Sequence, residues 1–104
     1  MAIVHAGSKN VYADLGSKDA AEMIVKAQLA HKINTLIKRK HLTRIEAAAL
    51  FGMSQAKISG MLRGQFRGIS EDRMMRCLIA LGQNVEIVIK PARAGKQAVL
   101  SVAA

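Results

Sequence analysis

The chain has 104 residues, one cysteine and a formal net charge of +9 from sixteen Lys or Arg and seven Asp or Glu. This length predicts a single domain with a modest core, and the lone Cys77 excludes an internal disulfide framework and fits a reducing cytoplasm. No apolar run approaches the roughly 20 residues of a membrane span, and residues 1–18 lack the layout of a signal peptide.

The positive charge is concentrated in the middle of the chain. Residues 38–76 hold nine Lys or Arg and three Asp or Glu. Such a surplus favours a polyanionic partner, which could be nucleic acid, an anionic membrane surface or an acidic protein, although charge alone can also serve solubility. Aromatic residues number three, so Ala, Leu, Ile, Val and Met are expected to fill the interior.

The first elements in chain order are a lead-in and a long helix. Residues 1–18 show no periodicity and are expected to be flexible or turn-rich. From about residue 19 to residue 40, apolar residues recur at spacings of three and four, which predicts a helix. It ends in Lys38, Arg39 and Lys40, cations well placed for a helix C-terminus or for an external anion.

Two short helices are expected next, separated by a glycine turn. Thr43 and Glu46 have the spacing of a capping box that begins the first helix, and Gly52 ends it. Ser54 caps the second helix, residues 55–63, whose inward positions would be Ile58, Met61 and Leu62. Two short helices joined by a tight turn, the second with polar exposed positions, form a helix-turn-helix.

The last helix begins at Ser70 and runs through Leu81, which closes a helical domain at residues 19–82. Residues 83–91 then alternate apolar and polar positions, and this alternation predicts a strand that ends at a proline. A lone strand leaves backbone groups unpaired, so we expect it to pair with its twin across a two-fold axis, with a hairpin to residues 98–102 as the alternative. The dimer strand would use Val85, Ile87 and Ile89, and residues 92–104 would form a flexible basic tail.

The segment "LTRIEAAALFGMSQAKISGMLRG" resembles the DNA-binding unit of the Xre/Cro-like helix-turn-helix family. The likeness rests on Ala48, Gly52, "MSQ" at the start of the second helix, Ile58 and Ser59 within it, and "LRG" at its end. The flanking "NVYADLG" and "ALGQNVEIVIKP" are similar to antitoxins of the host-inhibition-of-growth type, whose partners are small ribosome-dependent RNA-cleaving toxins. The resemblance implies a mainly α fold: a five-helix, lambda-repressor-like bundle followed by one C-terminal β-strand that pairs across a dimer.

In such a protein the second helix lies in the major groove of a palindromic operator, with its N-terminal residues at base edges. An amide can pair with adenine, a methyl group can contact thymine, and an ammonium or hydroxyl can bond to several bases. The expected base contacts are Gln55, Ala56, Lys57 and Ser59. The expected phosphate contacts are Thr43, Arg44, Ser54, Arg63, Gln65 and Arg67. Gly60 departs from the family, which usually has a larger polar residue there, and we expect it to remove one base contact.

The sequence gives little sign of a metal site, a cofactor site or a catalytic site. The three histidines have neither metal-ligand spacing nor a neighbouring cysteine, and we expect no metal and no cofactor. Cys77 is expected to be a small core residue, and Arg73 and Arg76 to be surface charges. The chain contains no catalytic motif, so we expect no enzyme activity.

Three functions are consistent with these features. The first is a dimeric, sequence-specific DNA-binding repressor that is also the antitoxin of a type II toxin–antitoxin pair and autoregulates its operon. The second is a solitary Xre-like regulator without a toxin, for which a phage origin is one option. The third is a helical adaptor that uses the same scaffold for protein contacts alone. The concentration of basic residues around the helix-turn-helix favours the first two.

Overall fold

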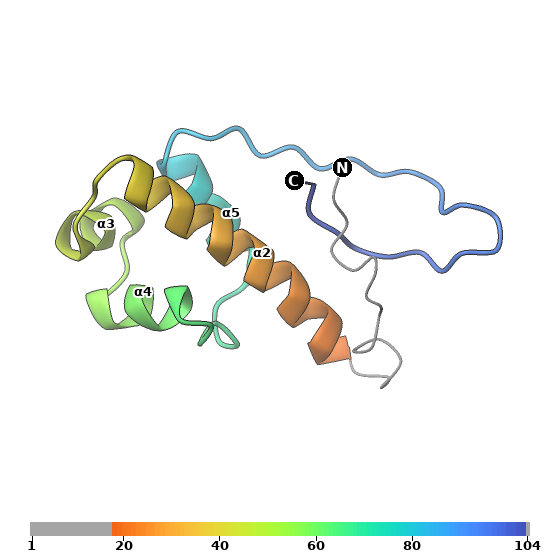
Figure 1. The fold of residues 1–104 in the computed structure, drawn as a ribbon, viewed down its shortest axis with the longest axis horizontal. Helices are drawn as coiled ribbons and strands as arrows, with labels where there is room; N and C mark the ends of the chain where they lie inside the picture. The colour runs from red at the N-terminus through yellow and green to blue at the C-terminus, as the bar shows by residue number, and fades with distance from the viewer. Residues whose placement is uncertain (1–17, 104) are drawn as a thin grey trace.

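The computed structural model describes residues 18–103, which form four helices (Figure 1). The helices, labelled as in Figure 1, are α2 (Lys18–Arg39), α3 (Arg44–Phe51), α4 (Gln55–Leu62) and α5 (Glu71–Ala80). The long helix α2 packs against both α5 and α4, while α3 packs against α4 and α5. Residues 1–17 of the expected lead-in at 1–18 lie outside the described residues, and Lys18 is the first residue of α2. None of the helices in the described part of the chain combines the length and hydrophobicity of a membrane span.

Hydroxyl caps determine where the three short helices begin. Thr43, Ser54 and Ser70 each have extended backbone, and each hydroxyl oxygen accepts a hydrogen bond of 3.0–3.1 Å from the backbone N–H three residues on. At Thr43 the capping box is complete, because its backbone N–H donates to Glu46 Oε1 at 2.8 Å. These caps satisfy backbone donors that have no partner inside a helix. The predicted helix boundaries agree with the structure to within one residue for this reason.

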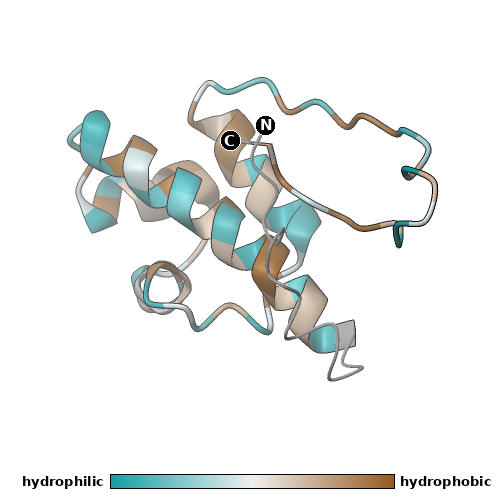
Figure 2. Ribbon diagram, turned by 45° about the vertical axis from the view of Figure 1, so that its right-hand side comes forward, coloured by the Kyte–Doolittle hydropathy of each residue, from teal (hydrophilic) through white to brown (hydrophobic). Residues whose placement is uncertain are grey.

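The core is built from aliphatic and sulfur-containing side chains of all four helices. Ile33 of α2, Ile58 and Met61 of α4, and Met74 of α5 are fully buried. Phe51 and Phe66 are the aromatic members of this cluster. Figure 2 shows polar and apolar residues alternating along α2, as expected for a helix with one buried face. Burial of this apolar surface is the main favourable contribution to the fold.

The expected five-helix bundle with a C-terminal strand is wrong for the described residues, which contain four helices and no β-strand. The helical period stops at Gly82, so the chain beyond it carries no pattern for a further helix. The residues that follow do alternate, but a strand needs a neighbour to bond its backbone groups, and the described chain supplies none. The dimer strand predicted at Val85, Ile87 and Ile89 therefore has no counterpart in this structure.

Residues 83–103 instead form an extended segment that leaves α5, turns and comes back (Figure 1). The turn includes a hydrogen bond of 3.0 Å from the Lys96 N–H to the Arg93 carbonyl. Val85 and Val102, near the two ends of the segment, are partly buried against the core. Between them large apolar side chains are exposed, up to 92% at Ile89. The segment thus contacts the helical domain mainly at its two ends.

Candidate DNA-binding surface

The turn between α3 and α4 depends on a left-handed glycine and on a contact from α5. Gly52 has φ 65° and ψ 35°, a conformation that L side chains adopt at a cost, and its N–H donates to the Ala48 carbonyl. Arg73 Nη2 donates to the carbonyls of Phe51 at 3.2 Å and Gly52 at 2.9 Å. Arg73 is exposed, as expected for a surface charge, and its guanidinium also caps the C-terminal end of α3 and so supports the turn.

Helix α4 is docked by its inward residues and presents its first turn to solvent. Ile58 and Met61 are fully buried and pack in the core. Gln55, Ala56 and Lys57 are exposed, and the first turn contains no acidic residue. A polar and basic first turn that projects from a fixed helix has the geometry needed to contact base edges in a major groove.

The expected base contacts therefore differ in how accessible they are. Ser59 is half-buried, unlike the exposed side chains in the first turn. Gly60 is buried, and a Cβ built on it would lie 3.2 Å from Gln65 Oε1. The glycine gives room for the Gln65 side chain to lie beside the helix. The expectation that Gly60 removes a base contact stays a prediction.

The predicted phosphate contacts lie before and after α4 in the chain, and all six are exposed. These residues are Thr43, Arg44, Ser54, Arg63, Gln65 and Arg67. The hydroxyls of Thr43 and Ser54 accept bonds as helix caps, and each can still donate its own proton to a phosphate oxygen. Their contacts to DNA stay predictions.

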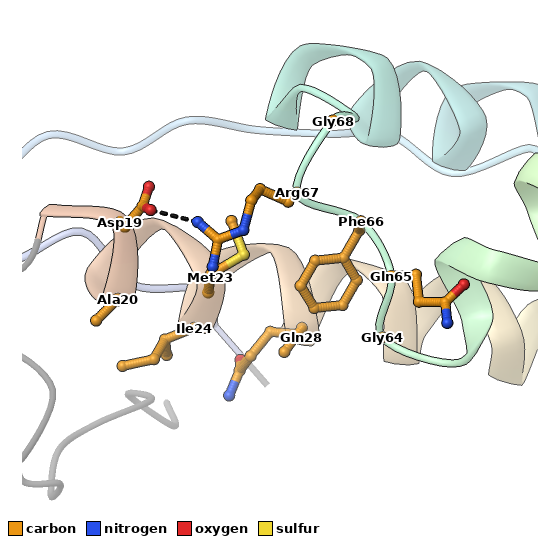
Figure 3. Close-up of a pocket in the computed structure, with 11 residues that line it drawn as sticks. Asp19, Ala20, Met23, Ile24, Gln28, Gly64, Gln65, Phe66, Arg67 and Gly68 are labelled. Carbon is orange, nitrogen blue, oxygen red and sulfur yellow. Dashed lines mark hydrogen bonds and ion pairs between the residues drawn. The ribbon is translucent and has the colours of Figure 1, made fainter.

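Arg67 has a partner within the domain. Its guanidinium Nη1 forms an ion pair with Asp19 Oδ2 of α2, and Figure 3 shows the two side chains directed toward each other. The pair lies on an open groove of about 900 Å³ between α2 and residues 64–68, which Phe66 and Met23 also line. Both members of the pair are largely exposed, so the attraction is weak and Arg67 can exchange Asp19 for an external anion.

The loop after α4 also receives the ammonium of a buried lysine. Lys26 of α2 is 2% exposed, and its Nζ donates to the Arg67 carbonyl at 3.1 Å. The same Nζ lies 3.1 Å from Glu22 Oε2, one helical turn earlier. Nothing in the sequence distinguishes Lys26, because its position among the α2 residues gives no sign of a partner 41 residues away.

Cys77 is a core residue, as the sequence analysis expected. It is 3% exposed, and its Sγ lies 3.9 Å from Met53 Sδ. Burial raises the pKa of this thiol, and the positive charge of Arg73 opposes the shift. The described residues also contain no group of three His, Cys, Asp or Glu side chains that could hold a metal ion.

Comparisons with known proteins agree with this geometry. Residues 11–90 match the family described as "Helix-turn-helix domain". A solved structure named "Putative XRE Family Transcriptional Regulator" is 40% identical and superposes with a TM-score of 0.76, over 83% of this chain and 98% of that chain. No curated protein matches the chain. The chain therefore belongs to the helix-turn-helix family, a class of DNA-binding domain.

Proposed function

We propose that the chain is a transcriptional regulator that represses genes by binding a specific DNA sequence, with α4 in the major groove. The observation that carries this proposal is the first turn of α4, where Gln55, Ala56 and Lys57 are exposed while Ile58 and Met61 hold the helix in the core. The similarity to a protein named as an XRE family regulator supports it. Regulation at DNA would place the protein in the cytoplasm, with its operator.

The proposed contacts divide into two groups. Gln55, Ala56 and Lys57 read base edges, with a smaller part for the half-buried Ser59. The exposed phosphate-contact residues, which precede and follow α4 in the chain, position the helix without reading sequence. Arg44 stands in the first turn of α3, where the positive end of the helix dipole adds to its attraction for phosphate.

We also propose that the regulator is a homodimer on a two-fold repeat. One α4 reads only one half-site, and two copies related by symmetry would read half-sites about 34–36 Å apart. The extended segment at residues 83–103 offers a surface for a second copy, because Ile87, Ile89 and Leu100 are 74%, 92% and 70% exposed. Packing of these side chains needs no β-ladder. The test is sedimentation of the double variant Ile87→Ser, Leu100→Ser and of the wild type. A monomeric variant and a dimeric wild type would support this contact, and a variant that stays dimeric would contradict it.

The antitoxin role is the finer part of the proposal. It rests on the likeness of "NVYADLG" and "ALGQNVEIVIKP" to antitoxins of the host-inhibition-of-growth type. In that role the protein would bind a small RNA-cleaving toxin encoded beside it and would repress the operon of both. A solitary regulator would have the same DNA surface and no such partner.

The first test is the binding of the purified protein to DNA upstream of its own gene, against random duplex, across a salt series. Saturable binding at a two-fold repeat, at least about a thousandfold tighter than to random DNA, is the expected result. Equal and salt-sensitive affinity for both duplexes would contradict sequence-specific repression, and no affinity for either would favour the adaptor function.

A second experiment separates the antitoxin from the solitary regulator. The chain is expressed together with the proteins encoded next to its gene, and purification then recovers any stable complex. Recovery of a small protein that cleaves RNA when freed from the complex would support the antitoxin role. In cells, the small protein expressed alone would arrest growth. Co-expression of the regulator would relieve that arrest.

A further inference from the structure

Lys26 is the one buried charged residue in the described part of the chain, and its ammonium has two partners. Its Nζ bonds to the Arg67 carbonyl and lies beside the Glu22 carboxylate, each at 3.1 Å. No buried side-chain polar atom among the described residues lacks a partner. The ammonium therefore joins the middle of α2 to the loop that follows α4.

Stability alone does not account for a lysine at this position. Taking an ammonium out of water is costly, and the attraction of the Glu22 carboxylate, which is 42% exposed, offsets only part of that cost. The hydrogen bond to a backbone carbonyl, by contrast, is directional, so it fixes where the loop lies. Phe66 and Ile69 anchor the same loop by apolar burial, which holds it near α2 without setting its orientation.

The orientation of this loop matters for the surface described above. Gln65 and Arg67 belong to the loop, and Arg63 immediately precedes it at the C-terminal end of α4. The loop is also bonded back to α4, because the Gln65 N–H donates to the Gly60 carbonyl at 2.7 Å. A displacement at the Arg67 carbonyl would therefore reach the end of α4 through this short connection.

We propose that Lys26 is a positioning residue for DNA binding, which holds the loop after α4 so that Arg63 and Gln65 face the phosphate backbone. The inference rests on the proposed DNA-binding function. Lys26 itself is buried and does not touch DNA in this arrangement. Its effect passes through the loop backbone at Arg67.

The test compares Lys26→Met with Lys32→Met. Both remove one positive charge from α2 and keep a long unbranched side chain, but Lys32 lies on the side of α2 near the C-terminal segment, away from the loop. Three quantities are measured for each protein: the urea midpoint of unfolding, the affinity for operator and random duplex across a salt series, and the amide hydrogen exchange of residues 64–68.

For Lys26→Met we expect a lower urea midpoint, because the part-buried bond to the Arg67 carbonyl and the pairing with Glu22 are lost, and we expect faster amide exchange in the loop. Both duplexes are bound about five- to tenfold more weakly, and the salt slope falls by roughly one, as for a lost phosphate contact. Lys32→Met is expected to match the wild type in loop exchange and in salt slope. A purely structural lysine would lower the urea midpoint without changing the salt slope of the protein that remains folded.

Two results would overturn the positioning role. In the first, the wild type binds its operator and Lys26→Met binds it with the same affinity and the same salt slope. That result would contradict the positioning role and leave the proposed DNA-binding function intact. In the second, the amide exchange of residues 64–68 in Lys26→Met equals that of the wild type. This measurement needs no DNA, so it tests the role of Lys26 even if the wild type binds none. If Lys26→Met does not fold, the double variant Glu22→Gln, Lys26→Met removes the carboxylate left behind and is tested in the same way.

Discussion

Gly60 of α4 provides a sharp test of the packing around the recognition helix. Ala at a helix interior is more stable than Gly by about 0.5–1 kcal/mol. The nearest atom to a new Cβ is Gln65 Oε1 at 3.2 Å, and the next is Gln65 Cβ at 3.6 Å, an ordinary contact. Because Gln65 is exposed, its amide can move by a few tenths of an ångström at little cost. We therefore expect Gly60→Ala to stabilise the domain by about 0.5–1 kcal/mol, a rise in Tm of roughly 2–8 °C.

The matched comparison is Gly52→Ala, which makes the same chemical change in the turn before α4. A Cβ there would meet nothing closer than Arg73 Nη2 at 4.0 Å, but the backbone has φ 65°. The strain of the left-handed conformation is expected to lower stability by about 1–2 kcal/mol. Thermal unfolding followed by circular dichroism measures both variants. A fall in Tm for Gly60→Ala as large as that for Gly52→Ala would refute the expected gain in helix stability. Adding Gln65→Ala to the Gly60→Ala variant would then show whether contact with the Gln65 amide is responsible.

Four further predictions concern single side chains. Gln55→Ala is expected to weaken operator binding by about 1–3 kcal/mol and to relax base choice at one position, and an equal loss on random duplex would contradict a base contact. Arg44→Ala should weaken all duplexes alike and reduce the salt slope by roughly one, measured by the same titrations. Arg73→Ala removes both bonds to the end of α3, so we expect a loss of about 1 kcal/mol in urea unfolding, whereas an unchanged midpoint would mean that water replaces them. Because the folded thiol of Cys77 has the higher pKa, stability should fall as pH rises above about 9, where the unfolded thiol ionises first, and Cys77→Ala should lose this part of the slope.

The sequence predicted the helices well because the signals that begin them are local. Thr43, Ser54 and Ser70 each bond to a backbone N–H only three residues away, so the cap and its helix can be recognised together. The spacing of apolar residues identified the inward face of α4, and Ile58 and Met61 are indeed fully buried. The exposed first turn followed from the same periodicity.

The contacts that sequence reasoning missed are long-range or depend on a partner. Lys26 bonds to a carbonyl 41 residues away, and Arg73 to one 21 residues away, and no spacing in the chain indicates either pairing. The alternation around Ile87 and Ile89 indicates which side chains share a face, but it does not supply the neighbour that a strand needs. Gly60 was interpreted as an outward position, although the packing of Gln65 makes it a buried one.

The shortness of α3 and α4 links DNA binding to the folding of the whole domain. Each has 8 residues, and isolated helices shorter than about 12–15 residues are marginal in water. The two helices that form the surface therefore exist only while α2 and α5 hold them. A duplex that binds the folded state alone raises its stability, by about 2.7 kcal/mol at a DNA concentration one hundred times Kd. An occupied operator would thus protect the regulator from unfolding and from the proteases that attack opened chains, so that the free and bound pools of the protein would be degraded at different rates.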